Sequence, residues 1–159
     1  MIDYPGLLGA LAGAGVRFII VGGAAATAHG SARLTQDLDI VYARTPDDLA
    51  RVVRALGPYQ PYLRGAPPGL PFRFDVETLQ RGLNFTLTCK LGDIDLLGEI
   101  VGGGGYAELE SHSAPIELFG VRCLCLGLDK LIEVKRAAGR AKDLEVVAEL
   151  IAIRELRER

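Results

Sequence analysis

Two aspartates, Asp37 and Asp39, are separated by a single residue in the segment DLDIVY. The β-branched and aromatic residues of this segment predict a strand, and residues two apart in a strand share one face, with Cα atoms about 6.5–7 Å apart. Two such carboxylates repel each other unless something positive lies between them. They could share or flank divalent cations, and an oxygen-only site suits Mg²⁺ or Mn²⁺. They could instead form the solvated acidic face of an edge strand.

A second pair, Asp93 and Asp95, repeats the pattern in the segment GDIDLL. Asp95 lies between two apolar residues, where a charged group requires a partner. Asp93 follows the glycine of a predicted turn and is more easily solvated. We therefore predict that Asp95, on a strand beside Asp37 and Asp39, supplies the third carboxylate of a metal site.

Gly22 and Gly23 follow the segment RFIIV (17–21), whose β-branched residues predict a buried strand. Two residues without side chains at a strand-to-helix turn would let a phosphate approach backbone N–H groups. A tight turn explains the same pair without a ligand. The pair belongs neither to a Walker loop, because no GKS or GKT follows, nor to the GxGxxG dinucleotide motif.

These features occur in a fixed order: a hydrophobic residue with two glycines, thirteen residues (24–36), the DxD strand, and a later strand aspartate. The order resembles the nucleotidyltransferase superfamily that shares its fold with DNA polymerase β. It is most similar to the minimal bacterial branch that includes AbiE-type toxins and MNT-type antitoxins. The further matches to that branch are Arg33, Thr35 and Asp37 as R-x-T/S-x-D, LIEVK (131–135) as a helix motif, and RAKDL (140–144) as a later motif. The resemblance covers roughly residues 17–150.

The resemblance implies an α/β (α+β) fold with a small mixed sheet flanked by helices. It also implies in-line transfer of NMP from an NTP to a hydroxyl group, with release of pyrophosphate. Asp37 and Asp39 would hold two Mg²⁺ (or Mn²⁺) ions that clamp the triphosphate, and Asp95 would hold the second ion and prepare the attacking hydroxyl. The implied nucleotide-binding residues are Gly22, Gly23, Arg33, Thr35 and Lys135. The chain has Gly-Gly where many relatives have Gly-Ser, so a serine hydroxyl contact is lost.

The sequence leaves three classes of acceptor open: an RNA end such as that of tRNA, a partner protein, and a small molecule such as an aminoglycoside. A function of another class also fits, in which the protein binds a nucleotide or a partner without turnover, as one half of a toxin–antitoxin-like pair. A generic α/β domain with acidic hairpins and no site is the third hypothesis.

Three charged residues near the motifs have two interpretations each. Arg33 could bind phosphate or pair with Asp37 or Asp39. Lys135 could bind phosphate or belong to an exposed charged helix face. Asp143 could complement the start of its helix or make a catalytic or structural contact.

The segment 57–71 holds five of the eight prolines and predicts a long loop. Aromatic and basic residues in or beside it could hold a base or an RNA strand, although ordinary loop packing is the favoured interpretation. These residues are Tyr59, Tyr62, Arg64 and Arg73.

The 159 residues predict one domain (1–159), with a core over about 17–126 and C-terminal helices over about 127–158. A net charge of −2 gives no general attraction to nucleic acid, and no DNA partner is expected. Three cysteines without CxxC spacing predict neither a disulfide framework nor a zinc site. With no basic leader and no apolar run of about 18 residues, we expect a cytoplasmic protein without a membrane span.

Periodicity and turn residues predict the remaining elements. We expect a flexible loop at 102–105, hairpins at 83–97 and 115–126, and a last helix with an apolar stripe of Leu144, Val147, Leu150, Ile151 and Ile153. The expected helices span 5–14, 24–29, 46–56 with Thr45 as N-cap, 106–111, 128–138 and 141–159.

Overall fold

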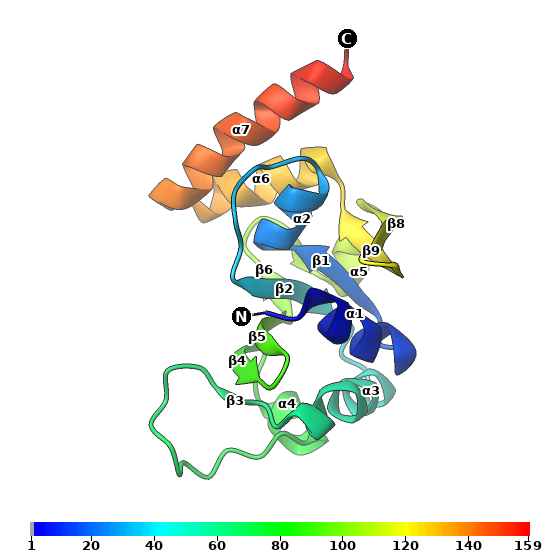
Figure 1. The fold of residues 1–159 in the computed structure, drawn as a ribbon, viewed down its shortest axis with the longest axis vertical. Helices are drawn as coiled ribbons and strands as arrows, with labels where there is room; N and C mark the ends of the chain where they lie inside the picture. Colours follow the sequence, from blue (N-terminus) through cyan, green and yellow to red (C-terminus); the bar gives the residue numbers. More distant parts are fainter. Residues whose placement is uncertain (1) are drawn as a thin grey trace.

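The computed structural model describes residues 2–159, which form a mixed β-sheet flanked by helices (Figure 1). The order of the seven strands is β3 (Tyr62–Leu63), β4 (Asn84–Cys89), β5 (Gly92–Leu97), β2 (Asp37–Tyr42), β1 (Phe18–Val21), β9 (Val121–Leu126) and β8 (Ser113–Leu118). The helices are α1 (Tyr4–Gly13), α2 (Gly22–Ala28), α3 (Pro46–Leu56), α4 (Val76–Arg81), α5 (Tyr106–Glu110), α6 (Leu128–Ala138) and α7 (Ala141–Arg157). This architecture confirms the predicted fold class.

The middle of the sheet combines both strand directions. β2 is antiparallel to β1 and parallel to β5, and β1 is parallel to β9. The outer pairs β3–β4, β4–β5 and β8–β9 are antiparallel, so the two hairpins predicted from the sequence are confirmed. Because β2 and β5 are parallel neighbours, paired residues on them point to the same side of the sheet.

One side of β2 and β5 belongs to the hydrophobic core. Leu38 and Ile40 on β2, with Ile94 and Leu96 on β5, are fully buried. The side chains between them alternate to the opposite side, as the sequence pattern predicted. The core therefore fixes the register of these strands, because a slip of one residue would bury charged groups and expose the apolar ones.

The helices form two groups around the sheet. α1 packs against α3 and β9, whereas α2 packs against β1, β2 and α6, and α6 packs against α7. Figure 1 shows α2, α6 and α7 gathered at one end of the molecule, with α3 and α4 towards the other. Within residues 2–159, no helix has both the length and the apolar composition needed to cross a membrane.

The prediction of one unbroken loop over 57–71 is wrong. Residues Gly57–Tyr59 form a 3₁₀ turn (η1), and Tyr62–Leu63 form the edge strand β3, paired with Leu87 and Thr88 of β4. The predicted loop at 102–105 also contains a short strand, β7 (Gly104–Gly105), which pairs with β6 (Glu99–Ile100). Such two-residue strands depend on pairing with distant residues and leave no periodic signal in the sequence.

Helix α4 was not predicted, although its start has a recognisable cap. The Asp75 side chain accepts a hydrogen bond from the backbone N–H of Thr78 at 2.8 Å. Leu79 is fully buried and holds the helix on the core. With only six residues and one buried side chain, the helix is too short for a periodic pattern to reveal it.

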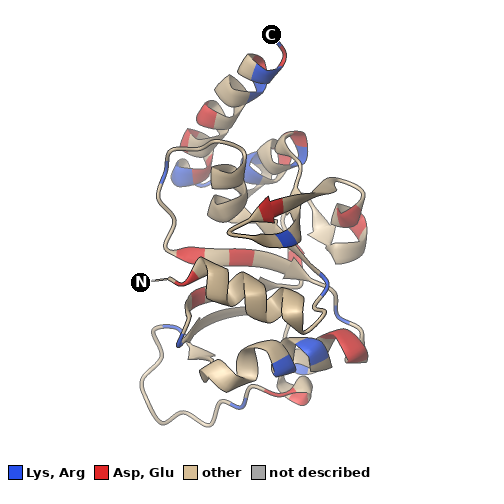
Figure 2. Cartoon of the chain, turned by 45° about the vertical axis from the view of Figure 1, so that its right-hand side comes forward, with Lys and Arg blue, Asp and Glu red and all other residues tan. Residues whose placement is uncertain are grey.

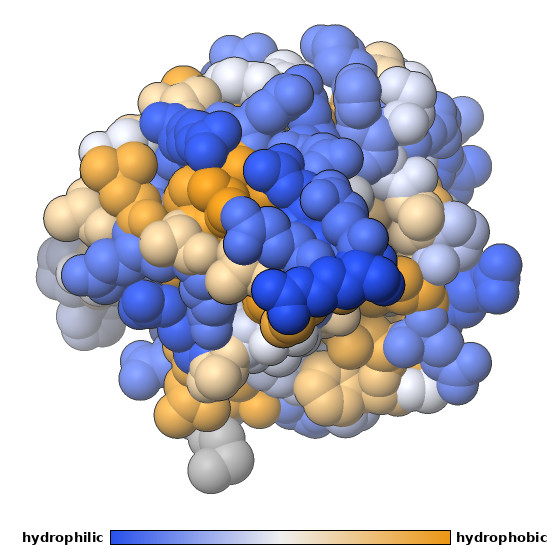
Figure 3. Space-filling model, turned by 90° about the horizontal axis from the view of Figure 1, so that it is seen from above, coloured by the Kyte–Doolittle hydropathy of each residue, from blue (hydrophilic) through white to orange (hydrophobic). Residues whose placement is uncertain are grey.

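Helix α7 differs from its predicted apolar stripe at one position. Val147 and Leu150 are buried, and Ile151 and Ile153 pack against the core, but Leu144 is 51% exposed. The preceding side chain, Asp143, points inward instead, and neighbours on a helix are about 100° apart. The face of the molecule seen from the α7 end is mainly hydrophilic, with apolar side chains showing between the polar ones (Figure 3).

Helix α3 begins with a buried charge that ties it to the start of β1. Asp48 is 1% exposed, and its side chain closes a capping box with Thr45. Arg17 donates to both carboxylate oxygens, from Nε at 3.0 Å and from Nη2 at 2.7 Å. The hydrogen bonds from Arg17, together with those from Thr45, lower the pKa of Asp48 to about 2 despite its burial.

We expect Asp48→Asn to destabilise the protein at pH 7 by about 2 kcal/mol, the free energy that corresponds to a pKa lowered by about two units. Because the pKa of Asp48 is lower in the folded protein, its charged form stabilises the fold above the unfolded pKa of 3.8. This stabilisation is lost as the pH falls towards 2. The difference in the free energy of unfolding between wild type and Asp48→Asn should therefore become smaller below pH 4. Urea unfolding at pH 7 and pH 3 measures it.

Asp47→Asn is the matched control, because Asp47 is the exposed neighbour in the same helical turn. Its effect at pH 7 should be within about 0.5 kcal/mol. Equal effects of the two substitutions would contradict a specific role for the buried carboxylate.

Candidate active site

The two DxD patterns lie side by side on β2 and β5. Asp37 pairs in register with Asp93, and Asp39 pairs with Asp95, so four carboxylates share one side of two adjacent parallel strands. Figure 2 shows acidic positions in red on the strands in the middle of the molecule. Each aspartate is held there by the buried residues that alternate with it.

Three of the four carboxylates converge. Asp37, Asp39 and Asp95 each offer an oxygen, and these oxygens lie within 4.8 Å of one another. Asp93 is not part of this group. The sequence-based choice of Asp95 over Asp93 thus agrees with the geometry, while the catalytic role of the three residues stays a prediction.

The carboxylate of Asp39 combines burial, neighbouring negative charges and an oxygen without a hydrogen-bond partner. Burial, followed by the negative charges of Asp37 and Asp95, raises the pKa of Asp39 to about 7, and the positive charge of Lys135 partly opposes the rise. Its Oδ1 atom is buried and has no hydrogen-bond partner among the described residues. A buried polar atom without a partner is costly, so this oxygen is in an unfavourable state in the protein alone.

These observations fit a divalent cation. The donor set consists of carboxylate oxygens only, which is the set that Mg²⁺ and Mn²⁺ prefer. A cation bound by Asp37, Asp39 and Asp95 would give the unpartnered oxygen a ligand and favour the charged form of Asp39.

Arg64 supplies the positive charge that the acidic pairs require. Its Nη2 lies 2.8 Å from Oδ1 of Asp95, its Nε lies 3.3 Å from Oδ2 of Asp93, and its Nη1 lies 3.6 Å from Oδ2 of Asp37. The guanidinium also donates to the carbonyl oxygen of Leu87 on β4, at 2.7 Å from Nη2. The side chain follows β3 at the sheet edge and reaches over β4 to the acidic strands.

Ordinary loop packing was therefore the wrong interpretation for Arg64. Its role depends on β3, a strand of two residues inside a proline-rich segment. In the sequence alone, Arg64 and Arg73 are equivalent basic residues in or beside the proline-rich segment. Only the pairing of β3 with β4 places Arg64 at the carboxylates.

Gly22 is required by the close approach of Asp39. Its φ of +64° lies in the left-handed region, which side chains rarely adopt. A β-carbon built there would also collide with the Asp39 carboxylate. The structure thus gives Gly22 a role that the sequence did not reveal: it leaves room for the carboxylate at the turn between β1 and α2.

Gly23 leaves room for Thr35 in the same way, because an added β-carbon would lie 2.9 Å from Oγ1 of Thr35. The Thr35 hydroxyl donates to the backbone oxygen of Asp37 at 3.0 Å. The Tyr4 hydroxyl lies 3.3 Å from the same oxygen. The segment before β2 is thereby fixed against α1 and the start of α2.

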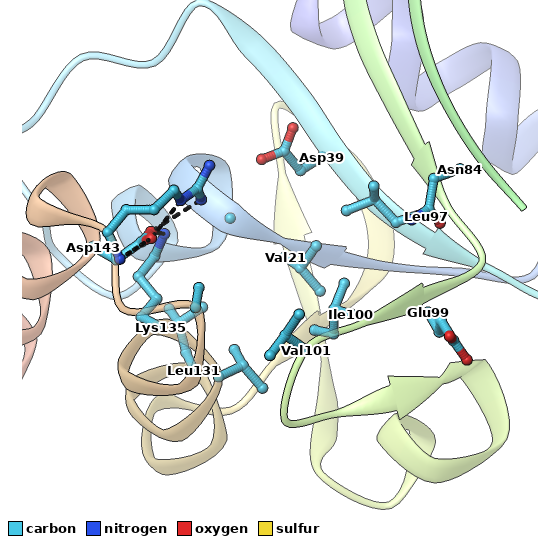
Figure 4. A pocket seen from close by; sticks show the side chains of 14 residues that line it. Val21, Asp39, Asn84, Leu97, Glu99, Ile100, Val101, Leu131, Lys135 and Asp143 are labelled. Atoms are coloured by element: carbon cyan, nitrogen blue, oxygen red, sulfur yellow. Dashed lines mark hydrogen bonds and ion pairs between the residues drawn. The ribbon is translucent and has the colours of Figure 1, made fainter.

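A second group of charges faces Asp39 from α6 and α7. Asp143 is 2% exposed, and Arg140 donates to both its oxygens, at 2.6 Å from Nε and 3.2 Å from Nη2. Lys135 Nζ lies 3.7 Å from Oδ1 of Asp143. Although burial alone would raise it, the hydrogen bonds and charge of Arg140 hold the pKa of Asp143 below its ordinary value. Figure 4 shows Lys135 and Asp143 across the cavity from Asp39.

The exposed-face interpretation of Lys135 is wrong, because its side chain is only 14% exposed and lines the site. Both structural interpretations of Asp143 hold: it closes the capping box at the start of α7 and makes a buried contact. Arg33 does not pair with Asp37 or Asp39. It contacts two glutamates of α7 instead, Glu145 at 3.4 Å and Glu149 at 3.7 Å.

Two cavities meet at Asp39. One, of about 460 Å³, has four cationic side chains in its wall and includes all three converging aspartates. The other, of about 400 Å³, is mainly apolar. The cations of the first cavity are Arg33, Lys135, Arg140 and Lys142; the apolar side chains of the second include Val21, Leu97, Ile100, Val101, Leu131 and Val134 (Figure 4).

We expect Asp39→Asn to stabilise the metal-free protein at pH 8 by about 2–4 kcal/mol. The folded-state pKa of Asp39 is raised, so between pH 4 and 7 the folded protein holds a proton that the unfolded chain releases. The stability of the wild-type protein should therefore fall between pH 4 and 7. The asparagine side chain cannot ionise, so the variant lacks the contribution of Asp39 to this fall. Urea unfolding in EDTA at pH 5 and pH 8 measures the difference.

Asp93→Asn is the control, since it removes the same charge from the next strand at a site that is 38% exposed. Asp93→Asn should increase the free energy of unfolding at pH 8 by less than Asp39→Asn does, because it also removes an ion pair with Arg64. An Asp39→Asn variant less stable than wild type at pH 8 would contradict the assignment of strain to this carboxylate.

No protein-family model and no curated protein matches this sequence. Among solved structures, the fold is similar to that of a protein from Thermotoga maritima described as a "putative nucleotidyltransferase". The TM-score is 0.57 at 13% sequence identity, and the alignment covers 96% of this chain and 89% of that one. At this identity the likeness concerns the fold, and the chain therefore has a nucleotidyltransferase-like fold.

Proposed function

We propose that the protein is a Mg²⁺- or Mn²⁺-dependent nucleotidyltransferase that transfers NMP from an NTP to a hydroxyl acceptor. The main support is the convergence of Asp37, Asp39 and Asp95, with one buried oxygen that has no partner, in the wall of a cation-lined cavity. The nucleotidyltransferase-like fold is consistent with this function. Membership of the AbiE-type or MNT-type branch stays a prediction.

The cation-lined cavity fits the triphosphate. Lys135 and Arg140 are held in place by the buried Asp143, so their positive charges are oriented before a ligand arrives. Arg33 would have to exchange its contacts with Glu145 and Glu149 for a phosphate.

The backbone at the start of α2 completes the proposed nucleotide site. Gly22 lines the mainly apolar cavity and Gly23 the cation-lined one, and in this proposal their backbone N–H groups would bind phosphate oxygens. Thr35 acts through position, because its hydroxyl is engaged by the backbone of Asp37.

Bound at the three aspartates, a divalent cation would neutralise phosphate charge and polarise the α-phosphate. In the transfer, the acceptor oxygen forms a bond to the α-phosphorus while the bond from that phosphorus to the bridging oxygen of pyrophosphate breaks. The proton of the acceptor hydroxyl passes to Asp95, which lies on the strand farther from α2. We propose an RNA end, a protein or a small molecule as the source of the hydroxyl.

A non-catalytic function is the second candidate, and one contact favours it. Because Arg64 pairs with Asp37, Asp93 and Asp95, the carboxylates are partly neutralised without any metal. A protein that only binds a nucleotide or a partner, as in a toxin–antitoxin-like pair, could keep them for structural reasons. Turnover separates the two functions.

Release of pyrophosphate from each of the four NTPs, with Mg²⁺ or Mn²⁺ and with or without total RNA, tests the proposal. We expect activity with at least one NTP, and a loss of about a hundredfold or more in Asp37→Asn and Asp95→Asn, because each removes a metal ligand. A labelled NTP identifies the acceptor class by the product that carries the label.

Asp93→Asn is the internal control, since this carboxylate lies next to the converging group without belonging to it. It should retain activity within about tenfold of wild type. An equal loss of activity in Asp93→Asn and Asp95→Asn would contradict the assignment of Asp95 as the third carboxylate. Nucleotide binding without turnover for every acceptor would favour the non-catalytic function.

A further inference from the structure

We propose that Arg64 is an internal counter-cation that occupies the acidic cluster in the metal-free protein and is released from it when a divalent cation binds. This inference rests on the proposed function, because it concerns the regulation of the same site. The acidic cluster is Asp37, Asp39, Asp93 and Asp95.

The contacts of Arg64 overlap with those that a metal would need. Asp37 and Asp95 are two of the three residues whose oxygens converge, and both are ion-pair partners of Arg64. A guanidinium and a divalent cation repel each other at such short range. The two cations therefore compete for the same carboxylates.

Asp39 shows which part of the cluster Arg64 leaves uncompensated. None of the hydrogen bonds or ion pairs of the described residues joins Arg64 to Asp39, and the buried Oδ1 of Asp39 has no partner. Arg64 neutralises the side of the cluster nearer β4 and leaves the side nearer α2 ready for a stronger cation. A dication can contact all three converging oxygens, which the single charge of Arg64 does not do.

Release of Arg64 requires only a side-chain movement. The guanidinium also donates to the Leu87 carbonyl oxygen, and this contact can persist when the carboxylates are given up. The backbone N–H of Arg64 is bonded to Thr86 of β4 at 3.0 Å, so the strand itself need not detach. The side chain is 26% exposed, so solvent can receive the displaced charge.

The consequence is a lower affinity for metal in exchange for a stable metal-free state. Without Arg64, four carboxylates on two adjacent strands would repel each other with no counter-charge on the β4 side. With Arg64 in place, each metal-binding event must first break two of its ion pairs.

Isothermal titration calorimetry of Mn²⁺ binding to the metal-free protein tests the competition between Arg64 and the metal. We expect Arg64→Ala to bind Mn²⁺ about tenfold more tightly than wild type, because a positive charge beside the site has been removed. Arg64→Lys should lie between the two, since an ammonium is a compact charge that lacks the planar fork of arginine. Arg73→Ala removes the same charge from an exposed position just beyond the proline-rich segment 57–71 and should bind as wild type does.

The outcomes separate this inference from the proposed function. If wild type binds Mn²⁺ and Arg64→Ala binds it equally or more weakly, Arg64 supports the site and the inference is wrong, while the metal site stands. If neither protein binds Mn²⁺, both proposals fail. Asp37→Asn, which should bind at least tenfold more weakly than wild type, shows that the titrated site is the acidic cluster.

A measurement on the wild-type protein covers the case in which Arg64→Ala does not fold. The ¹⁵N–¹H resonance of the Arg64 Nε, assigned by its absence in Arg64→Lys, should be sharp and protected from exchange in EDTA. Saturating Mg²⁺ should shift it, because Nε leaves the Asp93 carboxylate even if it keeps its hydrogen bond to Leu87. A resonance unchanged by Mg²⁺ at concentrations that bind the protein would show that Arg64 stays on the carboxylates.

Discussion

Repulsion between carboxylates on two adjacent parallel strands is the constraint around which this end of the molecule is built. The register of β2 and β5 brings Asp37 beside Asp93 and Asp39 beside Asp95, and the buried leucines and isoleucines between them prevent a shift. Hydrophobic burial thus holds in place an arrangement that electrostatics alone would separate. Strain of this kind is typical of sites where a ligand completes the balance of charge.

Positively charged side chains on two sides of the carboxylates offset this repulsion. Arg64 approaches from the sheet edge, while Lys135 and Arg140 approach from the helices, held by the buried Asp143. Asp39 lies between the two groups, and its burial, followed by the negative charges of Asp37 and Asp95, raises its pKa to about 7. This carboxylate, which holds a buried oxygen without a partner, lines both cavities.

The sequence predicted the parts of the site that depend on local pattern. Alternation identified β2 and β5 and the shared face of the aspartates, and the apolar neighbours of Asp95 distinguished it from Asp93. Long-range pairing was out of reach: Arg64 acts through a two-residue strand, and the helix contacts of Arg33 involve α7, more than a hundred residues later. The strained φ of Gly22 could be suspected from its residue type, but the cause, the Asp39 carboxylate, lies seventeen positions further along the chain.

The capping box of α7 has a significance beyond helix stability. The Asp143 carboxylate accepts from the backbone N–H of Arg140 at the start of that helix, and it also anchors the side chains of Arg140 and of Lys135 on α6. Folding of the C-terminal hairpin of helices and assembly of the cationic wall are consequently one event. A chain that has folded the sheet but not yet docked α7 has its acidic residues without the anchored cations that face them, so the two sides of the cavity are complete only once α7 is in place.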